Sequence, residues 1–254
     1  MTIAAAPDVA LSVRDVGKSY GPSGTHVLAL EGISLEARRG EFLCLVGASG
    51  CGKSTLLNLI SGLDRPTRGE ISINGRASLL FQEAALFPWL TAAGNVELPL
   101  RLAKLPSADR RREARELLDL VHLVGFADKR PHELSGGMRQ RVAVARALAQ
   151  HADILLMDEP FGSLDAMTRD LLHDELERIW QETGITVIFV THDVREAVRL
   201  GDRILVLTSR PGRVANEMTV DLPRPRNIAS PEVSALAATV TERLRTEVRS
   251  HAGD

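Results

Sequence analysis

The sequence predicts an α/β fold with a mixed sheet, made of an antiparallel part and a parallel core, and an inserted helical subdomain. Three observations support this prediction. Short segments that alternate apolar and polar residues occupy the first third of the chain, as in strands with one buried face. Continuous apolar runs, typical of parallel strands covered on both faces, recur along the chain. Helical patterns separate these runs.

The strands of the antiparallel part are predicted from alternation, and those of the parallel core from unbroken apolar character. Alternation is found at residues 11–13, 33–35 and 71–73. Continuous apolar runs are found at residues 42–46, 154–157 and 187–190.

Helices are predicted from apolar spacing and from residues that begin or end a helix. A helical pattern starts at Ser107, and Pro131 interrupts the chain after it. Ser135 is a candidate N-cap for a helix that runs to Ala149. Further helices are predicted over residues 166–183, ended by a glycine, and over residues 231–248.

These elements predict a single domain over residues 1–254. Its α/β core comprises residues 8–82 and 146–215, and its helical subdomain comprises residues 83–145. Residues 216–254 form a C-terminal tail with one helix.

Composition is that of an ordinary soluble globular protein, with 44% hydrophobic and 25% charged residues. A net charge of -2 gives no electrostatic attraction to nucleic acid or anionic lipid, so no nucleic-acid partner is expected. Two cysteines do not make a disulfide framework and fit a reducing compartment. No signal peptide or membrane span is predicted, so any link to a membrane is expected through a partner protein.

The strongest motif is a glycine-rich loop over residues 47–54, which follows the buried strand 42–46 and opens a helical pattern. Glycines let consecutive backbone N–H groups surround phosphate oxygens, while Lys53 reaches the β- and γ-phosphates and Ser54 binds Mg²⁺. This order of strand, loop and helix predicts a P-loop NTPase core. The residues expected to bind the nucleotide here are Gly47, Ala48, Ser49, Gly50, Cys51, Gly52, Lys53, Ser54 and Thr55.

Two carboxylates follow the buried strand 154–157, at the sheet edge where open α/β folds bind their ligands. Asp158 is placed to hold Mg²⁺ through water, and Glu159 to polarise the water that attacks the γ-phosphate. The alternative is that the two acids only begin a turn before Pro160.

A second anion-binding arrangement occurs in the segment Leu134-Ser-Gly-Gly-Met-Arg-Gln140, where Ser135 and two glycines begin a helix. One ATPase site needs only one such loop. With the two preceding motifs, this segment makes the sequence closely resemble the ATP-binding subunits of ABC transporters over residues ~11–215.

The resemblance implies that Ser135, Gly136, Gly137 and Met138 form the signature loop, which contacts the γ-phosphate bound by the opposite subunit. Met138 departs from the family, which often has glutamine there, and the link from residue 75 to residue 82 is short.

The resemblance also gives roles to residues outside the three motifs. Tyr20 corresponds to the aromatic residue that stacks on adenine, although its ring could instead cap the core. Gln82 is expected to contact Mg²⁺ and the attacking water, and His192 to contact the γ-phosphate. Asp165, in the segment Ser163-Leu-Asp165, belongs to the loop that crosses the dimer interface.

The implied assembly is a head-to-tail dimer of ATPase subunits that binds two ATP molecules, with Mg²⁺, at the cytoplasmic face of the cell membrane. Its partners are the permease subunits and, indirectly, a solute-binding protein. In the family a coupling helix of the permease docks just beyond the glutamine loop, so Leu86, Phe87 and Trp89 are candidate contacts. Packing inside the helical subdomain is the alternative.

Residues 87–91, 208–214 and 222–226 are similar to importer ATPases of the nitrate, sulfonate, taurine and bicarbonate group, which implies uptake of a small anion. The alternatives are an ABC ATPase of another importer class or a soluble ABC ATPase of DNA repair or translation. Retained Glu159 and His192 argue against a scaffold that binds ATP without hydrolysing it. A small-molecule kinase or GTPase would have no use for the signature loop.

Overall fold

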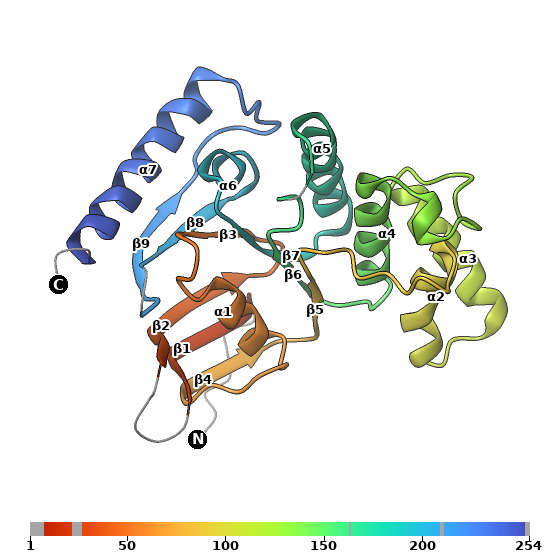
Figure 1. The fold of residues 1–254 in the computed structure, drawn as a ribbon, viewed down its shortest axis with the longest axis horizontal. Coiled ribbons are helices and arrows are strands. Elements are labelled where there is room, and N and C mark those ends of the chain that lie inside the picture. Colours follow the sequence, from red (N-terminus) through yellow and green to blue (C-terminus); the bar gives the residue numbers. More distant parts are fainter. Residues whose placement is uncertain (1–7, 22–26, 163, 209–210, 252–254) are drawn as a thin grey trace. The chain divides into compact units, whose positions relative to one another are not determined.

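The computed structural model describes residues 8–21, 27–162, 164–208 and 211–251, and the chain divides into two compact units (Figure 1). Residues 1–75 and 186–254 form the first unit, and residues 76–185 form the second. The second unit contains the predicted helical subdomain together with strands of the predicted core. The finer boundaries at residues 83 and 145 therefore stay predictions.

An antiparallel sheet in the first unit confirms the strands predicted from alternation. Its order is β2-β1-β4, and the bounds are Val9–Tyr20 for β1, Val27–Arg38 for β2 and Arg68–Ile73 for β4. Val13 lies opposite Leu35 on one side and Ile71 on the other, so the three side chains share one face, on which Val13 and Leu35 are buried and Ile71 is partly buried.

The first unit also contains the mixed part of the sheet, in the order β7-β3-β8-β9. The bounds are Phe42–Gly47 for β3, Thr186–Thr191 for β7, Arg203–Leu207 for β8 and Val214–Thr219 for β9. β3 pairs in parallel with β7 and β8, whereas β9 is antiparallel to β8. Every residue of β3 and β7 is buried, as the continuous apolar runs predicted.

Three helices accompany these strands in the described part of the first unit. They are α1 (Lys53–Ile60), α6 (Val194–Leu200) and α7 (Pro231–His251). α7 packs beside α6 (Figure 1), and its residues Val233, Ala237 and Val240 are buried. The predicted last helix is confirmed and extends three residues beyond residue 248, whereas α6, β8 and β9 were not predicted.

The described residues of the second unit form two parallel strands and four α-helices. The strands are β5 (Ala77–Leu80) and β6 (Ile154–Asp158). The helices are α2 (Ala92–Leu102), α3 (Ser107–Leu120), α4 (Gly136–Leu148) and α5 (Ala166–Thr183), with a 3₁₀ turn, η1 (Pro131–Glu133). α2 packs against α3 and α4.

The predicted ends of α4 and α5 agree with the structure because single residues fix them locally. The Ser135 hydroxyl accepts a hydrogen bond from the Met138 N–H at 3.2 Å and so caps α4. Gly184 ends α5 with φ 64°, a left-handed conformation that favours glycine. Among the described residues, no helix has the length and apolar character required to cross a bilayer.

Candidate functional site

The glycine-rich loop begins at the end of β3, and its first and last glycines have no space for a side chain. A Cβ on Gly47 would lie 2.6 Å from the Cys51 Sγ and 2.9 Å from the Leu207 carbonyl oxygen. At the other end of the loop, Gly52 has φ 93°, and a Cβ there would lie 2.5 Å from Leu30. Side chains are therefore excluded at both positions, and the backbone itself lines the loop.

The loop delivers backbone donors and one ammonium group to the start of α1. Among the residues described, no side chain caps this helix and its first turn contains no acid. Its N-terminal N–H groups, with the positive end of the helix dipole, suit an anion. Lys53 is only 6% exposed, and its Nζ donates hydrogen bonds to the carbonyl oxygens of Gly47 at 2.9 Å and Ala48 at 3.2 Å.

Cys51 lies within this loop, and an ionised Cys51 thiolate would repel a bound phosphate. Burial raises the pKa of the Cys51 thiol, although Lys53, whose Nζ lies 3.8 Å from the sulfur, acts in the opposite direction. The side chain therefore remains a neutral thiol, which adds no negative charge next to the phosphate-binding backbone.

Tyr20 lies close to the end of the phosphate loop, as its predicted contact with the nucleotide requires. Its hydroxyl donates a hydrogen bond to the Asp64 carboxylate at 3.0 Å, and the Thr55 side chain lies nearby. Burial and the hydrogen bond to Asp64 raise the pKa of the Tyr20 hydroxyl. The ring is 41% exposed and has the Lys18 Nζ 4.8 Å from its centroid, so it does not cap the core.

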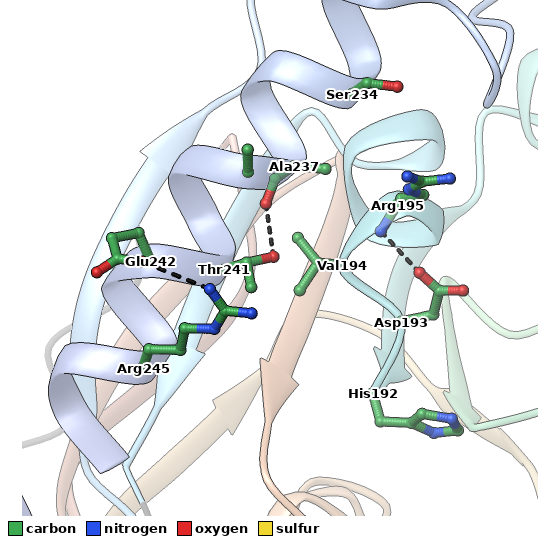
Figure 2. Close-up of a pocket in the computed structure, with 10 residues that line it drawn as sticks. His192, Asp193, Val194, Arg195, Ser234, Ala237, Thr241, Glu242 and Arg245 are labelled. Carbon is green, nitrogen blue, oxygen red and sulfur yellow. Dashed lines mark hydrogen bonds and ion pairs between the residues drawn. The ribbon is translucent and has the colours of Figure 1, made fainter. Parts of the chain in front are cut away.

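His192 and the phosphate loop leave neighbouring strands at the same edge of the sheet, because Val46 on β3 lies opposite Thr191 on β7. The Thr191 hydroxyl donates a hydrogen bond to Glu196 at 2.5 Å and accepts one from the Asp193 N–H at 2.9 Å. His192 is exposed and borders a groove of about 720 Å³ that α7 closes on the other side (Figure 2).

The acidic pair and Gln82 leave neighbouring strands of the second unit. Leu80 on β5 lies opposite Met157 on β6, so the residues that follow these strands share one edge. A Cβ placed on Gly162 would lie 3.8 Å from the Gln82 Nε2 and 3.9 Å from the Glu159 Oε2. Gln82 and Glu159 therefore border the same small space.

Glu159 is one of six described non-glycine residues with a left-handed backbone conformation. Its φ is 44°, which is uncommon for any residue other than glycine, asparagine or aspartate. Such strain is often found at functional sites. This conformation is compatible with the catalytic prediction for Glu159 and with the alternative that the acids begin a turn.

The signature loop packs directly on the start of α5. A Cβ on Gly137 would lie 2.6 Å from the Thr168 Cγ2. Thr168 is held in turn by Asp165, which accepts hydrogen bonds from its N–H at 3.0 Å and from its hydroxyl at 2.7 Å. The hydrogen bond from the Thr168 backbone, followed by that from its side chain, lowers the pKa of Asp165.

Two residues that the sequence analysis missed fix the segment that follows Gln82. The Arg146 guanidinium of α4 donates hydrogen bonds to the carbonyl oxygens of Ala84 and Ala85, both at 2.8 Å. The fully buried Asn95 side chain accepts a hydrogen bond from the Phe87 N–H at 2.8 Å and donates one to the Thr91 carbonyl at 2.9 Å. Neither residue carries a motif that would have identified it.

The predicted permease contacts differ in exposure. Trp89 is 69% exposed and Phe87 36% exposed, with their ring centroids 5.4 Å apart, whereas Leu86 is partly buried. Two exposed, adjacent aromatic rings favour the interface prediction over packing inside the helical subdomain.

The structure thus groups the predicted residues by unit. The first unit brings together Tyr20, the phosphate loop and the edge that carries His192. In the second unit, Gln82 lies near Glu159 and the signature loop contacts the start of α5. Ser163, part of the predicted interface loop, lies outside the described residues.

Comparison with known proteins identifies the family. The ABC transporter family model matches residues 30–162. The nitrate import ATP-binding protein NrtD of Synechocystis sp. is 46% identical over 221 residues, which cover 84% of this chain and 83% of the relative.

This chain belongs to the ABC transporter family. The aliphatic sulfonates import ATP-binding protein SsuB of Bacillus licheniformis is another ABC relative, 44% identical over 94% of this chain and 95% of its own. A solved ABC structure, the dimeric post-hydrolysis state of the ATP-binding cassette MJ0796 bound to ADP and Pi, superposes with a TM-score of 0.74. It is 36% identical and covers 84% of this chain and 100% of its own. The predicted fold class, ATPase activity and resemblance to nitrate and sulfonate importers are confirmed.

In this ABC ATPase, the contact between Gly137 and Thr168 predicts a pair of compensating substitutions. Gly137→Ala is expected to lower the unfolding free energy by about 1–3 kcal/mol, because the new Cβ overlaps a methyl group that cannot rotate away. Thr168→Ser removes that methyl group and keeps the hydroxyl that bonds to Asp165. The double variant should therefore recover wild-type stability in thermal unfolding, with Thr168→Ser alone as the control. Equal melting temperatures for Gly137→Ala and the double variant would contradict the contact.

Proposed function

We propose that this chain is the subunit that binds and hydrolyses ATP to energise import of a small anion, of the nitrate, sulfonate, taurine and bicarbonate group. It would act at the cytoplasmic face of the cell membrane, bound to permease subunits. A solute-binding protein would deliver the anion to those subunits. The observation that carries the proposal is the 44–46% identity to nitrate and sulfonate import ATPases over most of the chain. An ATPase of another importer class is the alternative.

The phosphate loop provides the groups for ATP binding. Backbone N–H groups at the start of α1 would bind the phosphate oxygens. The ammonium group of Lys53 would exchange its carbonyl partners, Gly47 and Ala48, for the β- and γ-phosphates. The exposed ring of Tyr20 would stack on the adenine.

The donor set expected for Mg²⁺ fits that ion. The Ser54 hydroxyl, the Gln82 amide oxygen and the Asp158 carboxylate are hard oxygen ligands, and Ser54 and Gln82 are exposed. When bound, Mg²⁺ neutralises charge on the phosphates and so favours attack at the γ-phosphate. Glu159 would orient and polarise the attacking water, and His192 would contact the γ-phosphate.

The signature loop would serve the site of a second ATPase subunit in a head-to-tail dimer. Exposed Ser135 begins α4, and the N–H groups of Gly136, Gly137 and Met138 form the positive end of that helix. Asp165 at the start of α5 would line the same interface. Support comes from the dimeric state of the solved relative.

The aromatic pair Phe87 and Trp89, with Leu86, would receive a coupling helix of the permease. Asn95 holds this segment from inside, and Arg146 ties the neighbouring residues 84 and 85 to the signature helix α4. A change in the signature helix could thereby reach the permease contact.

Uptake by intact cells tests the proposed function. In a strain that lacks the gene, uptake of labelled nitrate, taurine, an alkanesulfonate and bicarbonate would be measured with and without the wild-type gene. A Lys53→Met gene serves as the inactive control. Restored uptake of one anion by the wild type alone supports the proposal. Unchanged uptake of all four would refute the assignment to this group.

Tyr20 can be tested through the strength of ATP binding. Tyr20→Ala is expected to raise the KM for ATP about tenfold, since base stacking on an aromatic ring contributes about 1–3 kcal/mol. Tyr20→Phe retains the ring, and its KM should stay within about twofold because only the hydrogen bond to Asp64 is lost. Equal KM values for Tyr20→Ala and the wild type would exclude adenine stacking.

A further inference from the structure

Arg226, in the segment Leu222-Pro-Arg-Pro-Arg226, has a buried guanidinium that binds the C-terminal end of α6. The residue is only 6% exposed. Its Nη1 donates hydrogen bonds to the carbonyl oxygens of Val198 at 2.9 Å, Arg199 at 3.3 Å and Gly201 at 2.5 Å. The sequence analysis used this segment only as a mark of resemblance and gave Arg226 no role.

The same guanidinium is anchored on the segment that follows β9. Its Nη2 donates a hydrogen bond to the Val220 carbonyl at 3.1 Å, and its Nε donates one to the Leu222 carbonyl at 3.0 Å. Arg226 therefore joins two segments of the first unit through five backbone carbonyls.

Arg224 completes this contact from the same segment. Its Nη2 donates hydrogen bonds to the remaining carbonyl of the last turn, that of Leu200, and to the Asp202 Oδ1 at 2.9 Å. The other oxygen of Asp202 accepts a hydrogen bond from the Phe42 N–H at 2.9 Å, at the start of the strand that leads to the phosphate loop.

Such a contact matters because α6 is short. The last carbonyls of a helix have no partners within it, and a helix of seven residues is marginal on its own. Two guanidinium groups satisfy the carbonyls of residues 198 to 201 and place positive charge at the negative end of the helix dipole. The position of α6 therefore depends on Arg224 and Arg226, together with packing against α7, β3 and β7.

The other end of α6 lies next to His192. The helix begins at Val194, and Asp193 caps it by accepting a hydrogen bond from the Arg195 N–H at 2.8 Å (Figure 2). The hydrogen bond between Thr191 and the buried Glu196 ties the first turn to the residue before His192. Through these hydrogen bonds, a displacement of α6 would be transmitted to the backbone at His192.

We propose that Arg226, assisted by Arg224, is a positioning residue that holds α6 at its far end and thereby fixes His192 for ATP hydrolysis. The proposal rests on the role of His192 given under the proposed function. If Arg226 has this role, its substitution should lower ATP turnover and leave ATP binding unchanged.

A double-mutant cycle between Arg226→Met and His192→Ala tests this positioning role. The kcat and KM of ATP hydrolysis are measured for the wild type, both single variants and the double variant. Each kcat is divided by the number of nucleotide-binding sites, titrated with a fluorescent ATP analogue. Arg243→Met is the matched control, because Arg243 is exposed on α7 and hydrogen-bonds only to Asn216 among the contacts described.

Arg226→Met is expected to lower kcat per site about tenfold and to leave KM within about twofold. In the His192→Ala background the same substitution should change kcat by less than about twofold, because the histidine through which Arg226 acts is absent. Arg243→Met should match the wild type. A merely structural role would instead reduce the number of binding sites and leave kcat per site unchanged.

The inference is overturned if Arg226→Met lowers kcat equally with and without His192, or if it leaves kcat per site unchanged. If Arg226→Met does not fold, Arg226→Lys enters the same cycle, since lysine keeps the charge at the helix end but cannot bind five carbonyls. A wild-type rate in His192→Ala would refute the proposed role of the histidine itself, and the inference with it.

Discussion

Glu159→Gln is expected to reduce ATP turnover by at least about 100-fold while ATP still binds, because general-base assistance contributes about 10²–10⁴-fold. Glutamine has nearly the same shape as glutamate but cannot polarise water as a carboxylate does. ATP would therefore accumulate unhydrolysed. If two subunits share each nucleotide, as proposed, the variant should be trapped as an ATP-bound dimer.

Two measurements on the same samples check this expectation. Mg²⁺-dependent phosphate release gives the turnover, and size-exclusion chromatography at saturating ATP gives the dimer fraction. Glu116→Gln is the control, since Glu116 is 66% exposed on α3 and pairs only loosely with Arg112 at 3.9 Å. Equal turnover in Glu159→Gln and the wild type would remove Glu159 from catalysis. If Glu159→Gln lacks turnover but stays monomeric, the site shared by two subunits is contradicted and the catalytic role of Glu159 is retained.

Lys53→Met is expected to act one step earlier and to weaken ATP binding about 10- to 100-fold. A hydrogen bond between charged groups contributes about 1.5–3 kcal/mol, and the Lys53 ammonium would form such bonds to the phosphates. In the structure this ammonium hydrogen-bonds to two carbonyl oxygens of its own loop. Methionine fills the buried space but supplies neither the charge nor the donors.

Equilibrium binding of ATP by isothermal calorimetry measures this loss. Lys104→Met, at an exposed position of the second unit, serves as the control for loss of one lysine. Binding of ATP to Lys53→Met at wild-type affinity would refute the role of the ammonium group. The two substitutions should also be distinguishable, because Glu159→Gln abolishes turnover with binding retained and Lys53→Met impairs binding itself.

Features that depend on neighbours in sequence were predictable. Ser135 and Asp165 each accept a hydrogen bond from an N–H three residues later, so the starts of α4 and α5 follow from local chemistry. Unbroken apolar runs identified β3, β6 and β7, since burial on both faces leaves no position for a polar residue. The phosphate loop was evident because its glycines and Lys53 are contiguous.

The sequence alone therefore determined the central strands β3, β6 and β7, the starts of α4 and α5 and the residues proposed to bind ATP, because each is specified within a few positions of the chain. The tertiary structure decided which distant residues hold those groups in place. Arg226 binds carbonyls 25 to 28 residues earlier, and Arg146 binds carbonyls 61 and 62 residues earlier. A backbone carbonyl has no side chain to mark it as a partner, so no pattern in the sequence could reveal these contacts.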